Sequence, residues 1–175
     1  MTEDLAARLR ARLRRVPDFP TPGVLFRDIA PILADAELFG AAVDALAQPF
    51  AGAPPAWVAG VESRGFLLGA PMALRLGAGF LPLRKLGKLP GPTARQTYAL
   101  EYGTGELEAQ TGLVRPGDRV LLVDDVLATG GTAEAAAALV RALGGEPMAL
   151  AVLLELAELG GRARVPVPVH ALLAD

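Results

Sequence analysis

The 175-residue sequence contains no cysteine and no asparagine, and it has one histidine and two lysines. Without cysteine, the chain cannot form disulfide bonds or use a thiol as a nucleophile or metal ligand. The single histidine, His170, lies near the end of the sequence and away from other metal-binding residue types, so a structural or surface role is expected for it. No apolar run approaches the length that spans a membrane.

The N-terminal stretch, MTEDLAARLRARLRRV, is charged throughout and has no apolar leader segment, so we expect a cytoplasmic protein. A helix is expected from Thr2 to Arg15, with its five arginines on a solvated face. The formal net charge of −2 gives no general reason to bind nucleic acid.

The length and the 52% hydrophobic content predict a single globular domain over residues 1–175. Apolar segments alternate with amphipathic ones, which is typical of an α/β fold with a mostly parallel sheet and helices on both faces. The expected strands are residues 56–61, 79–84, 119–123 and 148–156, with a last edge strand within 165–173. The expected later helices are residues 37–48, 65–77 and 133–143. Residues 17–33 are expected to be an ordered loop, and residues 87–112 a long flexible hairpin.

The segment from Val120 to Val140 joins an apolar strand, two adjacent carboxylates and a loop rich in glycine and threonine. Ligands of open α/β sheets lie at the carboxyl ends of the strands, where Asp124 and Asp125 fall. The loop opens a helix, and its free N–H groups, small residues and hydroxyls suit a phosphate monoester. Its members are Ala128, Thr129, Gly130, Gly131 and Thr132.

The two carboxylates would repel that phosphate, so they are expected to bind hydroxyl groups or a hydrated metal on the same ligand. A ribose 5-phosphate carries both a phosphate and a vicinal diol. Other phosphate motifs fit less well, because the Gly-Lys-Ser/Thr ending of a P-loop and the G-x-G-x-x-G fingerprint are both absent.

The stretch VLLVDDVLATGGT resembles the phosphoribosyl-pyrophosphate signature of type I phosphoribosyltransferases. DFPTPGVLFRDIAPIL resembles the segment that opens adenine phosphoribosyltransferases, and ALEYGTGELE resembles their mobile flap. VESRGFLLG and RKLGKLPGPT match in the same order, so the resemblance covers most of the chain. One departure is Ala30, where the family usually has Thr or Ser. The resemblance implies the type I fold with a small N-terminal hood, about residues 1–34, and a flexible flap, about residues 87–112.

Two further strand ends are expected to bind pyrophosphate. Arg64 follows the strand at 56–61 and offers a planar fork for phosphate oxygens. The resemblance makes its loop, with Ser63, the pyrophosphate loop, with a cis peptide between Glu62 and Ser63. Both lysines lie in the next basic segment, where Arg84 and Lys88 are the expected contacts and Lys85 is expected to point away; a solvated basic turn is the alternative.

The resemblance also assigns the base site and the flap. Phe26 is the expected stacking platform for the purine, and the backbone groups of Leu25 and Arg27 are expected to bind the adenine edge. An ordinary ion pair between Arg27 and Asp28 is an alternative use of these side chains. Within the hairpin, Tyr98 and Tyr102 flank Glu101, which is expected to close over the base, exclude water and manage the proton on the imidazole nitrogens.

The resemblance therefore implies transfer of the phosphoribosyl group from phosphoribosyl pyrophosphate to adenine, giving AMP and pyrophosphate. The expected cofactor is Mg²⁺, held mainly by substrate oxygens and water with no direct side-chain ligand. A homodimer is expected, without nucleic-acid or membrane partners. The alternatives are a phosphoribosyltransferase for a 6-oxopurine and a non-catalytic purine regulator on the same fold.

Overall fold

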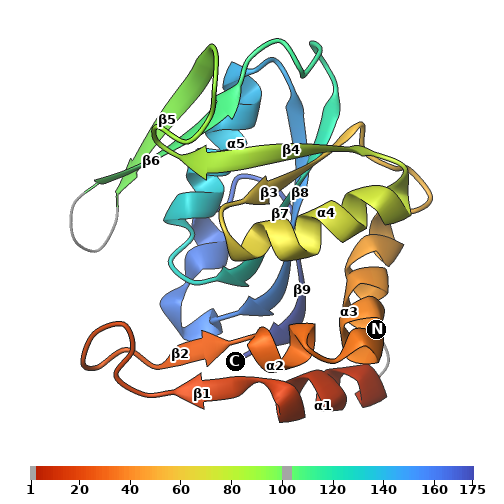
Figure 1. Cartoon of the computed structure of the whole chain (residues 1–175), viewed down its shortest axis with the longest axis vertical. Helices are drawn as coiled ribbons and strands as arrows, with labels where there is room; N and C mark the ends of the chain where they lie inside the picture. The colour runs from red at the N-terminus through yellow and green to blue at the C-terminus, as the bar shows by residue number, and fades with distance from the viewer. Residues whose placement is uncertain (1–2, 100–103) are drawn as a thin grey trace.

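The computed structural model describes residues 3–99 and 104–175, and their central feature is one large sheet (Figure 1). Within these ranges the sheet has seven strands in the order β5-β6-β4-β3-β7-β8-β9. Their bounds are β3 Trp57–Val61, β4 Gly79–Lys85, β5 Thr93–Ala99, β6 Thr104–Gln110, β7 Arg119–Leu127, β8 Glu146–Glu155 and β9 Val169–Ala174. Strands β4, β3, β7, β8 and β9 run parallel, and the β5–β6 hairpin is antiparallel. The expected mostly parallel sheet is confirmed.

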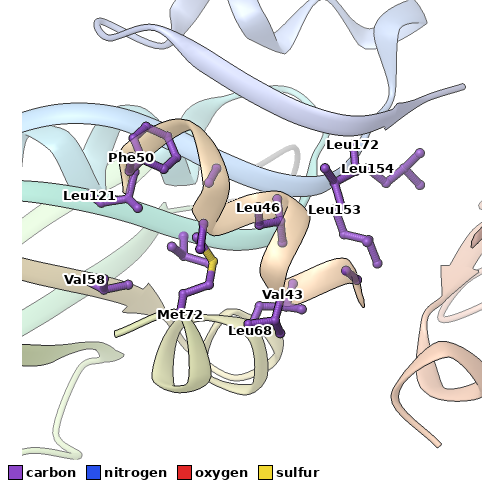
Figure 2. Packing of buried hydrophobic residues seen from close by; sticks show 14 of the residues in the cluster. Val43, Leu46, Phe50, Val58, Leu68, Met72, Leu121, Leu153, Leu154 and Leu172 are labelled. Carbon is purple, nitrogen blue, oxygen red and sulfur yellow. The ribbon is translucent and has the colours of Figure 1, made fainter. Parts of the chain in front are cut away.

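Helices cover both faces of the sheet, as the apolar strands require. On β7, Leu121 and Val123 join the cluster with α3 (Ala36–Ala47) and α4 (Arg64–Leu76). Val120 and Leu122, which alternate with them along the strand, join the opposite cluster with α5 (Gly131–Ala142), because successive strand side chains point to opposite faces. Figure 2 shows the first cluster, in which α3 packs against both α4 and the strands.

Local sequence signals set the helix ends. Asp35 precedes α3, and its carboxylate accepts a hydrogen bond from the Leu38 amide at 3.1 Å. Gly77 ends α4 in the left-handed conformation, with φ 63°. Three short 3-10 helices complete the described elements: η1 Gln48–Phe50, η2 Ala157–Leu159 and η3 Gly161–Arg164.

The N-terminal segment departs from the sequence-based prediction. Helix α1 covers Glu3–Arg12, and Arg14–Val16 form strand β1, which pairs antiparallel with β2, Phe26–Asp28. The prediction of a helix up to Arg15 was wrong because this long-range pairing outweighs local helix propensity. The prediction of a loop over residues 17–33 was also wrong in part, since β2 and the short helix α2, Ala30–Leu33, lie within it.

The five N-terminal arginines are paired rather than merely solvated. Arg8 binds Glu37, Arg12 binds Asp35, Arg14 binds Asp28, Arg15 binds Asp175, and Arg10 donates to the Ala174 carbonyl. These contacts tie residues 3–16 to three other parts of the chain, namely β2, the start of α3 and the end of β9.

The alternative of an Arg27–Asp28 ion pair is wrong. These residues are neighbours on strand β2, so their side chains point to opposite faces. Asp28 lies opposite Arg14 in the strand register and pairs with it, whereas Arg27 pairs with Asp175.

Candidate active site

The predicted phosphate loop lies between β7 and α5, at the carboxyl edge of the sheet. Gly130 is the residue that precedes α5, and it is left-handed, with φ 83°. The Glu134 amide donates to the Gly130 carbonyl at 2.9 Å, so the amides of the preceding turn have no intrahelical acceptor. All five predicted loop residues, Ala128 to Thr132, line one cavity of about 80 Å³, together with Asp124 and Val126. Such a helix start is a ready site for an anion.

A second glycine, Gly161, supports this loop and was not identified from the sequence. A Cβ added at Gly161 would lie 2.8 Å from the Gly130 nitrogen and closer still to the Ala128 carbonyl oxygen. The first turn of η3 therefore packs directly on the backbone of the phosphate loop. The only sequence signal is the Gly160-Gly161 pair, which by itself predicts no more than a turn.

The two adjacent carboxylates occupy different environments. Asp125 is 3% exposed, while Asp124 is partly exposed and lines both the phosphate cavity and the neighbouring one. Burial and the charge of Asp125 raise the pKa of Asp124 well above its ordinary value. Burial also raises the pKa of Asp125, and the Arg64 guanidinium opposes this shift. Hydroxyl groups that donate to these oxygens would stabilise their ionised forms.

Arg64 links the carboxylates to the predicted base site. Its Nη1 atom lies 3.1 Å from Oδ2 of Asp125, although neither atom makes a hydrogen bond within the described part of the chain. The guanidinium carbon lies 4.8 Å from the centre of the Phe26 ring, within the range of a cation–π contact. Arg64 is therefore positioned between Asp125 and Phe26.

A larger cavity, of about 430 Å³, lies beside the phosphate cavity. Ser63, Arg64 and Lys85 line it together with both aspartates and Tyr98. The Glu62–Ser63 peptide bond at its edge is cis, as the family resemblance implied. Lys85, which was expected to point away, lines this cavity.

The other two predicted pyrophosphate contacts, Arg84 and Lys88, are paired with Glu62. Its carboxylate accepts from Arg84 Nε at 3.1 Å and from Lys88 Nζ at 2.9 Å. Burial raises the pKa of Glu62, but the hydrogen bonds from Lys88, the Lys85 amide and Arg84 outweigh burial and lower it to about 2. Glu62 is therefore a charged anchor for the basic turn, a role that no sequence pattern indicated.

Glu108 of β6 accepts hydrogen bonds from the same turn. It is 1% exposed, and its Oε1 atom accepts from the amides of Lys88 and Leu89 at 2.8 and 3.0 Å. Thus, Glu62 binds the side chains of Arg84 and Lys88 and the Lys85 amide, and Glu108 binds the amides of Lys88 and Leu89.

The predicted base site forms a third cavity, of about 130 Å³. Leu25, Phe26 and Arg27 line it with Val24, Arg64, Val126 and Leu156. Phe19 packs edge-on against Phe26, with ring centres 5.1 Å apart, and thereby supports one side of the platform. The sequence analysis did not identify Val126 or Leu156, which reach the cavity from the ends of β7 and β8.

The flap residues are only partly described. Glu101 and Tyr102 lie outside the described residues, whereas Tyr98 lines the large cavity. Tyr98 also packs across the hairpin over Gly105, where an added Cβ would lie 2.6 Å from the tyrosine ring. His170 lies apart from the lining of all three cavities, beside the Phe50 ring at 6.2 Å, and burial lowers its pKa.

The described residues form neither a side-chain metal cluster nor a membrane-spanning helix. Residues 3–99 and 104–175 contain no group of three or more His, Cys, Asp or Glu side chains that could hold a metal ion. In the same ranges, no helix is long and apolar enough to cross a membrane.

Known proteins resemble this chain over nearly its whole length. The sequence model of the phosphoribosyl transferase domain family matches residues 32–166. An adenine phosphoribosyltransferase of Streptomyces clavuligerus is 53% identical over 174 residues, which are 99% of this chain and 98% of that protein. The crystal structure of adenine phosphoribosyltransferase from Rhodothermus marinus has a TM-score of 0.95 at 49% identity, covering 99% of this chain and 100% of that one. The structure of the Saccharomyces cerevisiae enzyme, complexed with an imino-altritol bisphosphate and adenine, has a TM-score of 0.93 at 40% identity. The match covers 98% of this chain and 100% of the yeast chain.

Proposed function

The chain belongs to the adenine phosphoribosyltransferase family, and on that premise we propose how its three cavities carry out the family reaction. The protein transfers the 5-phosphoribosyl group of phosphoribosyl pyrophosphate to adenine, which gives AMP and pyrophosphate in purine salvage. The alternatives, an oxopurine transferase and a regulator, lack comparable support among the relatives.

One observation carries this proposal: the three cavities adjoin in the order that the substrates require. The phosphate and large cavities share Asp124, the large and base cavities share Arg64, and Val126 borders all three. A 5′-phosphate, a ribose and a purine are linked in the same order in AMP. The yeast relative was solved with a bisphosphate and adenine, which fits the same division of the site.

The phosphate loop and the carboxylates hold the ribosyl part. The amides and hydroxyls of residues 128–132 bind the 5′-phosphate, and this binding energy aligns the reacting carbon. Asp124 and Asp125 accept hydrogen bonds from the ribose hydroxyls. Their negative charge also stabilises the positive charge that develops on the ribose as its C1–O bond to pyrophosphate breaks.

The leaving group shares the large cavity with the ribose, and the base occupies the third cavity. Ser63 and Arg64, which line the large cavity, bind the pyrophosphate oxygens and stabilise the charge that arrives on them. Arg84 and Lys88 line none of the three cavities and pair with Glu62, so they bind pyrophosphate only after releasing that carboxylate. Adenine stacks on Phe26, and the backbone of Leu25 and Arg27 binds its edge. The imidazole nitrogen of adenine then forms a bond to C1 from the face opposite pyrophosphate, with inversion, while Glu101 accepts its proton.

The site also fits a magnesium ion that is bound through the substrate. The described residues form no closed set of three metal ligands, and Asp124 is the partly exposed carboxylate at the edge of the large cavity. Mg²⁺ keeps much of its water shell and binds phosphate oxygens readily, so substrate and water supply most of its ligands. When bound, it neutralises charge on the pyrophosphate.

The proposed working unit is a cytoplasmic homodimer of single-domain chains. Each chain has a hood of about residues 1–34 and a flap of about residues 87–112 that closes over the site. An exposed apolar stripe on α4 supports the dimer: Leu67 and Leu74, two turns apart, are 48% and 85% exposed. Such a surface suits contact with a second protein chain.

The proposal is tested by turnover with phosphoribosyl pyrophosphate and Mg²⁺, offering adenine, hypoxanthine, guanine and xanthine separately. We expect AMP from adenine alone, with loss of turnover when EDTA removes the metal. Asp125→Asn should lower kcat/KM by roughly 100-fold, because charge stabilisation in the transition state is lost. Asp44→Asn is the control, since Asp44 forms an exposed pair with Arg75 on α3 and α4. Product from an oxopurine would overturn the base assignment, and nucleotide binding without turnover would indicate a regulator.

A further inference from the structure

The two strands of the hood place two arginines directly opposite each other. Arg15 of β1 and Arg27 of β2 are cross-strand partners in the register. Like charges opposite each other in a strand pair are destabilising. The Arg27 side chain is also only 10% exposed, so water screens its charge poorly.

The Asp175 carboxylate lies between both arginines and reduces their mutual repulsion. Its Oδ1 accepts from Arg15 Nη2 at 2.9 Å, and its Oδ2 accepts from Arg27 Nε at the same distance. The hydrogen bond from Arg27 is the main reason that the pKa of Asp175 lies below its ordinary value, so this carboxylate is charged at neutral pH. Arg27 uses another donor, Nη1, to bind the Leu25 carbonyl at 2.9 Å.

The backbone of Asp175 is tied to a second segment of the base-cavity lining. Its amide donates to the Glu155 carbonyl at 2.9 Å, and its main-chain oxygen accepts from the Ala157 amide at 3.0 Å. Glu155 and Ala157 flank Leu156, which lines the base cavity together with the hood residues Leu25 to Arg27. The end of the chain accordingly lies beside the hood in Figure 1.

We propose that Asp175 is a positioning residue for the base site. Its carboxylate fixes the segment from Leu25 to Arg27, and its backbone fixes the Leu156 segment, so one residue sets the spacing between these two segments of the cavity lining. This inference rests on the proposed function, because it requires that this cavity binds adenine. It adds a residue that touches no substrate and lies far from every sequence motif of the site.

The test is Asp175→Asn, with the KM values for adenine and for phosphoribosyl pyrophosphate measured separately. We expect the adenine KM to rise roughly tenfold, the size typical of a lost hydrogen bond to a charged group. The KM for phosphoribosyl pyrophosphate and kcat at saturation should stay within about twofold, because the phosphate loop is untouched. Asp44→Asn removes an exposed aspartate–arginine pair and should leave both KM values unchanged.

Two further variants separate positioning from general destabilisation. Adding Arg15→Gln to Asp175→Asn removes one of the two opposed cations, so part of the adenine KM should recover. Asp175→Glu keeps the negative charge but moves it by one methylene, so we expect a smaller rise in the adenine KM than for Asp175→Asn. If Asp175→Asn does not fold, Asp175→Glu takes its place in the test. Hydrogen exchange of the amides of residues 14–28 should accelerate in Asp175→Asn but not in Asp44→Asn.

The outcomes distinguish this inference from the proposed function. If the wild-type protein makes no AMP from adenine, the proposed function fails. If it makes AMP and the Asp175 variants change neither KM, or change both KM values equally, the positioning role of Asp175 is refuted while the function stands.

Discussion

Gly161→Ala tests whether the phosphate loop depends on its contact with η3. The new methyl group would lie 2.8 Å from the Gly130 nitrogen and closer to the Ala128 carbonyl oxygen, and both are backbone atoms that cannot rotate away. Gly161 is not among the glycines with positive φ, so an alanine fits its backbone conformation and only the contact is at issue. The loop must therefore move away from η3.

The size of the effect follows from that movement. A misplacement on the order of 1 Å at a reacting or positioning group can cost roughly 100-fold in rate. We therefore expect kcat/KM for phosphoribosyl pyrophosphate to fall about 100-fold, which corresponds to about 2.7 kcal/mol of transition-state stabilisation. The overpacked contact should also lower the free energy of unfolding by about 1–3 kcal/mol.

The assay is steady-state turnover with each substrate varied in turn, together with thermal unfolding. The KM for adenine should change little, because neither Gly161 nor its loop lines the base cavity. Gly40→Ala in α3 is the matched control, since an added Cβ there meets no atom within 4 Å. A Gly161→Ala enzyme with kcat/KM for phosphoribosyl pyrophosphate within twofold of wild type would refute this reasoning.

Two predictions concern the carboxylates that hold the basic turn. The pKa of Glu62 is lowered from 4.5 to about 2, so its charge stabilises the fold above pH 4.5, and this contribution, about 2–3 kcal/mol, is lost as the pH falls from 4.5 towards 2. Unfolding in urea across this range should show the difference between wild type and Glu62→Gln shrinking with acidification, and a constant difference would contradict it. Glu108→Ala leaves the amides of Lys88 and Leu89 without their buried acceptor and should cost about 3 kcal/mol or more in chemical unfolding. Glu106→Ala on the same strand, which removes a partly exposed carboxylate, should cost less than about 1 kcal/mol; equal losses would show that burial of Glu108 is unimportant.

The parts of the site that could be predicted from the sequence are short and contiguous. The segment from Asp124 to Thr132 contains a strand end, a glycine turn and a helix start, and each of these has a local signal. The alternation of apolar strands and helices also identified the mostly parallel sheet, because that pattern depends on burial rather than on distant partners.

The parts that could not be predicted depend on contacts between distant residues. Gly161 contacts the backbone of Ala128 and Gly130, and Asp175 binds Arg15 and Arg27. The residues next to Gly161 and Asp175 in the sequence do not indicate these partners. The composition also could not show that Lys85 lines the large cavity while Lys88 pairs with Glu62. Which of two basic residues lines the cavity depends on the position of Glu62, which lies 23 and 26 residues earlier in the chain.

The order of the strands has a consequence for how the protein acquires activity as it folds. The pyrophosphate loop follows β3 and the phosphate loop follows β7, and these strands are neighbours although about 60 residues separate Trp57 from its partner Val120. Parallel pairing over such a distance closes a long loop and is intrinsically slow. A nascent chain that lacks β7 cannot place the two loops side by side, so it has no site that could bind phosphoribosyl pyrophosphate through both of them. Substrate that bridges both loops can therefore stabilise the chain only after β3 and β7 have paired.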